Sequence, residues 1–258
     1  MTQLSSSKFS VILSLCISGA IASTSVQASL ESRAGGTMVY DTDLDITWVA
    51  DANLFKTLAN ASGNPANYVQ TIINANGGVV NDTPNDLDGN DGVYNLTSPD
   101  FNTNNGKMTW FGAQAWVNTL VYGGYSDWRL PTNPVIDLGD GYLNAHQAGS
   151  EMPHLFYNEL GGVEGGLLPN TSYFSNDQLI VGQSSPYWSS QEYGLNPKIA
   201  WIFDAALGLQ AYQIKSQSYL AWAVRSGDVA AVPVPGAMWM MGTGLLGLLG
   251  LNRRNKIQ

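Results

Sequence analysis

The stretch Gly123-Gly124-Tyr125-Ser126-Asp127-Trp128-Arg129-Leu130-Pro131-Thr132 combines a turn, a large aromatic residue, a lone cation and a proline. Trp128 and Leu130 share one face of this stretch where it is extended, because side chains alternate along a strand. Pro131 prevents a helix from starting early. The stretch therefore predicts a joint at which the chain passes from a helix into a sheet.

Two helices are predicted around this joint. The first covers residues 109–122. It begins at Thr109, a favoured capping residue, and ends at Gly123-Gly124, since glycine readily takes the left-handed conformation that closes a helix. The second covers residues 150–161. Apolar residues recur at helical spacing in both: Trp110, Ala113, Val117, Leu120 and Val121, with Trp116 beside them, and then Met152, Leu155, Phe156 and Leu160.

Runs with strand character lie toward both ends of the globular part. Residues 37–40 and 45–49 come first, and Asp51-Ala52-Asn53 caps a short helix that follows them. Helices followed by a meander of strands predict an α+β fold with two main helices packed on a small, mostly antiparallel sheet. The later runs cover residues 187–190, 200–204, 209–214 and 220–225.

Residues 60–106 are rich in Asn, Asp and Gly, which predicts a long insertion of turns with one short helix near 69–73. Its segment 86–92 places side-chain oxygens at alternate positions, and these suggest a calcium site. The glycine and glutamate of an EF-hand loop are replaced by Asp91 and Thr97, and a solvated turn is the alternative interpretation. The candidate calcium ligands are Asp86, Asp88, Asn90 and Asp91.

The composition excludes several classes of function. Of the 258 residues, 44% are hydrophobic and only 12% are charged. Without the four basic residues of the two end segments, 11 − 4 = 7 basic residues face 20 acidic ones, a net charge of −13. Such a surface repels phosphate backbones, which argues against nucleic-acid binding. Cys16 is the one cysteine, so cleavage of the apolar run that contains it leaves no thiol chemistry.

Both ends of the chain have the pattern of export signals. Residues 1–28 form a signal peptide, with Lys8 before an apolar run and small residues ahead of a cleavage site after Ala28. In the tail 232–258, an uncharged helix over 237–251, about 22 Å long, precedes a basic cluster that stays cytoplasmic. A buried helix is the alternative interpretation at each end. The globular domain between them covers residues 29–231.

The tail contains Pro233-Val234-Pro235, then the Gly-rich helix 237–251, then Arg253-Arg254. This order resembles a PEP-CTERM sorting signal, with Val234 at the position of the glutamate that gives the family its name. That departure bears on the subtype of sorting enzyme. The resemblance implies a bacterial envelope protein that passes transiently through the inner membrane, is processed by an exosortase-type transpeptidase and reaches the cell surface or extracellular matrix, often beside exopolysaccharide.

A signature of aromatic and charged residues runs through the body of the chain, and we expect it to form the structural core. Together with the strings 125–132, 187–190 and 223–225 it resembles the Lcl C-terminal-type domain over most of residues 34–229. The resemblance implies a C-type-lectin-like fold and, from the collagen-like adhesin that names the family, binding of sulfated polysaccharide. An acidic chain does not suit that ligand. The signature residues are Trp110, Trp116, Asp127, Trp128, Arg129, Trp201 and Arg225.

Arg129 has two interpretations. As a functional cation it grips a ligand carboxylate, and as a structural one it pairs inside the fold with an acid such as Glu159 or Asp204. Because the chain is poor in cations and Arg129 lies between Trp128 and Leu130, we expect the structural role, as we do for Arg225.

Two further groups are candidates for sites. Glu151 and His154 stand three residues apart on the second helix, with His146 upstream, a spacing that suits a shared zinc or iron ion. A helix-capping glutamate and a histidine at the edge of the core are the alternative. Four rings have the chemistry to stack on sugars, and we expect roughly one or two of them to be exposed enough to do so. These rings are Tyr125, Tyr187, Trp188 and Tyr193.

These observations predict an exported, non-enzymatic binding or matrix protein directed toward extracellular polysaccharide. The sequence contains no nucleophile elbow, P-loop or dinucleotide-binding motif, and we expect no cofactor other than calcium. Two alternatives stay open: a hydrolase of envelope glycans that acts through Glu151, Asp127 or Glu192, and a purely structural surface protein.

Overall fold

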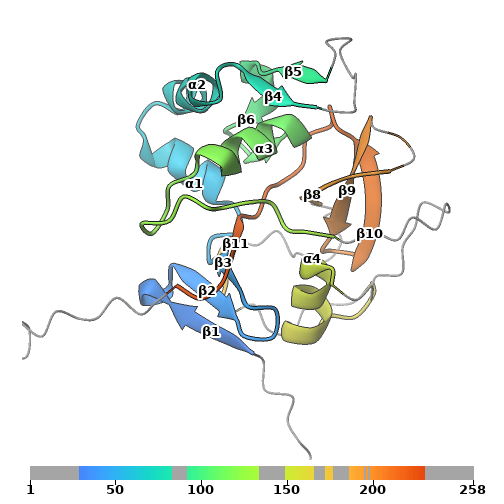
Figure 1. Cartoon of the computed structure of the whole chain (residues 1–258). Coiled ribbons are helices and arrows are strands. Elements are labelled where there is room, and N and C mark those ends of the chain that lie inside the picture. The colour runs from blue at the N-terminus through green and yellow to red at the C-terminus, as the bar shows by residue number, and fades with distance from the viewer. Residues whose placement is uncertain are drawn as a thin grey trace, which may run out of the picture.

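The computed structural model of the protein describes residues 29–82, 92–133, 149–165, 172–176, 186–194, 196 and 198–229. Its first sheet has four antiparallel strands in the order β1-β2-β3-β11. The strand β11 returns from the far end of the described chain to pair with β3 (Figure 1). The strands are β1 Leu30–Arg33, β2 Met38–Asp41, β3 Ile46–Val49 and β11 Val224–Ser226, with a 3-10 turn, η1 Ala34–Gly36, between the first two.

The second sheet has three antiparallel strands in the order β10-β9-β8. They are β8 Tyr187–Glu192, β9 Ile199–Asp204 and β10 Leu209–Ile214, and each contains or matches one of the predicted runs. Every residue of the central strand β9 is buried. The predicted run over 220–225 is strand only from Val224 onward.

Three helices, α1 Leu54–Ala61, α2 Pro65–Ala75 and α3 Trp110–Thr119, lie together on one side of the molecule (Figure 1). Thr109 caps α3 as predicted, because its Oγ1 accepts a hydrogen bond of 3.1 Å from the backbone N–H of Gly112.

The end of α3 differs from the prediction. The helix stops at Thr119, and Leu120 is already extended. Gly123 and Gly124 instead form a tight turn with positive φ at both positions, and Tyr122 and Tyr125 exchange two backbone hydrogen bonds of 3.0 Å across it. A two-residue turn of this kind needs positive φ at both central residues, so it uses the glycine pair that was expected to cap the helix.

Residues 60–106 contribute more regular structure than expected. The helix α2 has 11 residues, β4 Val79–Asn81 pairs with β5 Val93–Asn95, and β6 Phe101–Asn102 pairs with β7 Lys107–Met108, with a 3-10 turn, η2 Ser98–Asp100, before β6. Regular structure in this segment of the domain is therefore more extensive than the turns and one short helix that were predicted. The buried apolar residues of the segment pack into the main core: Val69, Ile72, Ile73, Val80, Leu96 and Phe101.

The second predicted helix is present in two parts. A single α-helical turn, α4 Glu151–His154, continues directly into a π-helix, η3 Leu155–Glu159. The backbone N–H of Leu160 donates to the carbonyl of Leu155, five residues earlier, at 3.0 Å. The apolar stripe of this segment is buried, as its spacing predicted.

The predicted joint connects α3 to the first sheet. Trp128 and Leu130 are buried. The backbone groups of Arg129 and Val224 exchange hydrogen bonds of 2.8 and 2.9 Å, so the stretch after α3 lies alongside β11. The α+β class is therefore confirmed, while the likeness to C-type lectins stays a prediction.

Within the described ranges, no helix has the length and apolar character needed to cross a membrane. The predicted signal peptide over 1–28 and the predicted helix over 237–251 lie outside those ranges.

Candidate functional site

The tryptophans of the signature belong to the interior. Trp110, Trp116, Trp128 and Trp201 are all buried. The indole N–H of Trp110 donates to the carbonyl of Ser189 at 2.9 Å, and that of Trp128 donates to Tyr125 at 3.2 Å. The bond of Trp110 joins α3 to β8, and that of Trp128 closes the turn next to it, so these two side chains have structural partners in the interior.

The rings expected to stack on sugars are mostly enclosed. Tyr187 and Trp188 are 0% exposed, so these two of the four candidate rings have no free face for a ligand. The two are neighbours on one strand, so their burial means that both faces of β8 are covered at this point. Tyr193 is also buried and packs against Trp201, with 5.4 Å between the ring centroids. Tyr125 is half-buried, and the guanidinium of Arg225 lies 4.2 Å from its ring centroid.

Arg129 forms a bidentate ion pair with Glu151, not with Glu159 or Asp204 as expected. Its Nη1 and Nη2 donate to Oε2 and Oε1 of Glu151 at 2.8 and 2.7 Å, and the backbone N–H of Thr132 adds a third hydrogen bond at 2.7 Å. Glu151 is buried, and a buried carboxylate needs this number of donors. The pair joins the stretch after α3 to the start of α4.

Arg225 forms a second bidentate pair, with Asp127. Its Nε and Nη2 donate at 2.9 and 3.0 Å. Hydrogen bonding to Arg225 lowers the pKa of the Asp127 carboxyl below its ordinary value. The Asp127 side chain is 56% exposed. This pair therefore fastens β11 to the joint at the surface.

A buried lysine was not foreseen from the sequence. Lys215 is 0% exposed, and its Nζ donates to Asp82 at 2.6 Å and to Glu192 at 2.7 Å. It also lies 4.6 Å from the ring centroid of Trp110. Because its acidic partners are 133 and 23 residues away in sequence, no local pattern pointed to it.

The three acids considered for glycan hydrolysis are therefore each bonded to a different cation. Glu151 pairs with Arg129, Asp127 with Arg225, and Glu192 with Lys215. Glycoside hydrolysis needs one carboxylate that holds a proton and another that stays charged. Three separate ion pairs do not supply that arrangement.

His154 and Glu151, the predicted metal pair, contact different partners. The Nε2 of His154 lies 3.2 Å from Oε1 of Glu159 and 3.7 Å from Oδ2 of Asp41. Glu151 is instead bonded to Arg129. His146, the third residue of that prediction, lies outside the described residues.

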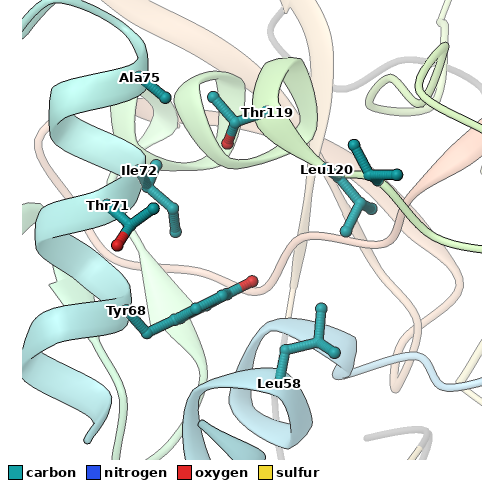
Figure 2. A pocket seen from close by; sticks show the side chains of 8 residues that line it. Leu58, Tyr68, Thr71, Ile72, Ala75, Thr119 and Leu120 are labelled. Atoms are coloured by element: carbon teal, nitrogen blue, oxygen red, sulfur yellow. The ribbon is translucent and has the colours of Figure 1, made fainter.

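A concave pocket of about 320 Å³ lies where α1, α2 and the end of α3 meet. Figure 2 shows the ring of Tyr68 reaching from α2 into the space between Leu58 of α1 and Leu120. This volume is at the lower end of the range of small-molecule sites, roughly 300–1,000 Å³. The lining is without charge: Leu58, Tyr68, Thr71, Ile72, Ala75, Thr119, Leu120 and Val121.

The hydroxyl groups of this pocket have complementary roles. Tyr68 Oη accepts a hydrogen bond of 3.3 Å from Trp116, and its own hydrogen goes to no acceptor among the described residues. Thr71 and Thr119 donate to backbone carbonyls of Asn67 and Ala115, at 3.0 and 3.1 Å. Their oxygens keep lone pairs as acceptors. The pocket therefore offers one donor and two acceptors beside apolar side chains.

Two groups of predicted residues lie outside the described part of the chain. The calcium candidates, Asp86, Asp88, Asn90 and Asp91, are one group, and the sorting motif with Arg253 and Arg254 is the other. Both predictions therefore rest on sequence.

Comparison with known proteins identifies two families. The model of the Lcl C-terminal domain matches residues 37–225, and the model of the PEP-CTERM protein-sorting motif matches residues 231–254. Searches of curated proteins and of solved structures found no match. The pocket, the ion pairs and the residues around His154 all lie within the first match or at its border.

Proposed function

This chain belongs to the Lcl C-terminal domain family and ends in a PEP-CTERM sorting motif, and from that premise we propose a non-enzymatic surface protein that binds neutral polysaccharide. The sorting motif implies export to the envelope and processing by an exosortase-type enzyme. The domain is then presented at the cell surface or in the extracellular matrix, where its uncharged pocket receives a sugar unit.

The chemistry of the pocket lining is the observation that supports a neutral sugar as the ligand. A sugar presents hydroxyl groups around its edge and C–H groups on its faces. The sugar hydroxyl groups can form hydrogen bonds with the Tyr68 hydroxyl and with the oxygens of Thr71 and Thr119. The C–H faces can pack against Leu58 and Leu120. A few convergent polar groups in an otherwise apolar concavity are typical of small-molecule sites.

The charge of the chain favours a neutral over an anionic polysaccharide. The formal net charge is −9, and the pocket lining contains no Lys or Arg to offset it. Like charges repel at long range in dilute salt, so a sulfated or carboxylated chain is disfavoured before it reaches the pocket. The ligand of the collagen-like adhesin therefore does not transfer to this protein.

The proposal is tested with a glycan array and a polysaccharide pull-down on the purified exported protein. Ala75 is exposed on α2 at the pocket, so Ala75→Trp fills the pocket from its rim without altering the core. Ala66→Trp makes the same exchange at an exposed position of the same helix outside the lining, and serves as the matched control.

We expect neutral glycans to bind the wild-type protein and Ala66→Trp, and Ala75→Trp to bind at least about tenfold more weakly, a loss of about 1.4 kcal/mol. Blank arrays for the wild-type protein would contradict polysaccharide binding and favour a purely structural surface role. Equal binding by Ala75→Trp would place the ligand elsewhere on the domain.

A further inference from the structure

Four residues from separate segments meet beside the first sheet, at the place where β1 begins and β2 ends. Asp41 ends β2, His154 ends α4, Glu159 ends the π-helix η3, and Ser29 immediately precedes β1. Asp41 and Glu159 are buried, and the His154 side chain is 18% exposed. The histidine is therefore the one of these three that reaches solvent. We call Asp41, His154 and Glu159 the edge cluster.

The π-helix is what brings His154 and Glu159 together. The two residues are five positions apart, and such residues lie about 140° apart around an α-helix. The wider turn of η3, closed by the hydrogen bond from Leu160 to Leu155, instead places Glu159 Oε1 3.2 Å from His154 Nε2. Single π turns within helices are frequent at functional sites.

The spacing within the edge cluster suits a metal ion. Three possible ligand atoms, one from each of Asp41, His154 and Glu159, lie within 4.8 Å of one another. His154 Nε2 is 3.2 Å from Glu159 and 3.7 Å from Asp41 Oδ2. Ligands about 2.0–2.2 Å from a tetrahedral zinc ion stand about 3.3–3.6 Å apart. Three protein ligands and a fourth position open to water are typical of zinc sites built from histidine and carboxylates.

The two oxygens of the Asp41 carboxylate have different surroundings. Asp41 is 0% exposed, and its Oδ1 accepts backbone hydrogen bonds of 3.0 Å from both Asp43 and Leu44. Its Oδ2 is buried, accepts no hydrogen bond from the described residues, and lies 3.7 Å from His154 Nε2. A buried carboxylate oxygen left without a donor is costly, and coordination of a cation removes that cost.

The charge balance of the edge cluster points the same way. Ser29 donates its backbone N–H to Glu159 Oε2 at 2.8 Å, and its hydroxyl lies 2.7 Å from Oε1. When the chain is cut after Ala28, as predicted, that nitrogen becomes an amino group whose charge offsets Glu159. A metal cation would offset the remaining charge of Asp41.

From these observations we propose that Asp41, His154 and Glu159 bind one divalent transition-metal ion of the zinc class. His154 supplies Nε2, Asp41 supplies Oδ2, and Glu159 supplies Oε1. The ion ties β2 to the end of η3 and so holds the first sheet against the second helical segment. The proposal does not depend on the glycan pocket or on sorting.

The test uses the purified exported protein, stripped with a chelator and titrated with Zn²⁺. Bound zinc is measured by elemental analysis after gel filtration, and unfolding temperature is recorded with and without Zn²⁺. Asp41→Asn keeps an oxygen to accept from Asp43 and Leu44 but removes the charge and Oδ2. Asp43→Asn makes the same change in the same turn at an exposed position, and is the matched control.

We expect one zinc ion per wild-type chain and a rise in unfolding temperature with zinc, because a ligand that binds the folded state stabilises it. Asp43→Asn should behave as the wild type, and Asp41→Asn should lose at least about tenfold in zinc affinity. Co²⁺ gives a second readout: its visible absorption bands should appear in the wild-type protein and vanish in His154→Ala. No bound zinc in the wild type, or equal affinity in Asp41→Asn, would overturn the proposal.

Discussion

Lys215 and Asp82 form an ion pair that is closed to solvent. Nζ of Lys215 lies 2.6 Å from Oδ1 of Asp82, and the two side chains are 0% and 2% exposed. Glu192 and the ring of Trp110 complete the surroundings of the ammonium group. The pair holds the turn after β10 against the end of β4, so it stabilises the contact between the second sheet and the α2 region.

Replacing this lysine should destabilise the domain strongly. Lys215→Met keeps the apolar stem but leaves the Asp82 carboxylate buried without its cation, which costs about 3–5 kcal/mol. The measurement is the free energy of unfolding in urea. Lys198→Met is the control, because Lys198 is exposed, and it should change stability by less than about 0.5 kcal/mol. Similar losses for both variants would contradict a special role for Lys215.

The Arg129–Glu151 pair should be energetically coupled. Its bidentate geometry and the burial of Glu151 predict a coupling energy of about 0.5–3 kcal/mol in a double-mutant cycle with Arg129→Gln and Glu151→Gln. The control cycle uses Arg33 and Asp228, which pair at 2.8 Å on the surface and should couple by less than about 1 kcal/mol. Additive effects at Arg129 and Glu151 would show that the pair does not join the two segments.

Gly112→Ala should destabilise the protein even though alanine is the better helix former. An added Cβ at Gly112 would lie 2.6 Å from the carbonyl oxygen of Asp100, a backbone atom that cannot move without disturbing η2. The usual gain of about 1 kcal/mol from replacing glycine within a helix should therefore be reversed. Thermal unfolding measures this, with Asn118→Ala at an exposed position of α3 as control. An unfolding temperature at or above that of the wild type would contradict the close approach.

The ion pair of Arg225 and Asp127 should make a small, pH-dependent contribution to the stability of the folded protein. Because Arg225 lowers the pKa of Asp127 in the folded state, the unfolded state binds the proton more readily. The contribution is present above the ordinary carboxyl pKa of about 3.9 and is lost as pH falls through the lowered value. The Asp127 side chain is 56% exposed, so the contribution of the pair to the free energy of unfolding should stay below about 1 kcal/mol.

The measurement for this pair is the free energy of unfolding of the wild-type protein and Asp127→Asn between about pH 2 and 7. The two curves should be separated near neutral pH and converge in acid. A gap that is constant across this range would contradict the ion pair.

The sequence predicted those parts of the fold whose signals are local. The three strands of the second sheet match the strand-like runs predicted over 187–190, 200–204 and 209–214, and the start of α3 follows from Thr109, which caps it. The helix α2 was underestimated, because composition over 60–106 hid a short apolar stripe whose burial depends on α3. The end of α3 was placed too late, because a glycine pair serves a hairpin turn as readily as a helix end.

The site residues were harder to predict because their partners are distant in the chain. The charge of Arg129 indicated an internal ion pair, but nothing local chose Glu151 over Glu159. The burial of Tyr187 and Trp188 depends on elements packed on both faces of β8. The approach of Glu159 to His154 requires a π turn, which helical spacing does not reveal. The pocket beside Tyr68 is formed by three helices and has no motif of its own.

The most direct test of the account is the intact mass of the protein recovered from the cell surface or matrix. We predict an N-terminus at Ser29, directly after the predicted cleavage site at Ala28, and loss of the terminal segment that contains Arg253 and Arg254. In a strain without its exosortase, the chain should remain in the inner membrane with that segment attached. A surface form that begins at Met1 or keeps Arg254, with the same location in both strains, would contradict export and sorting.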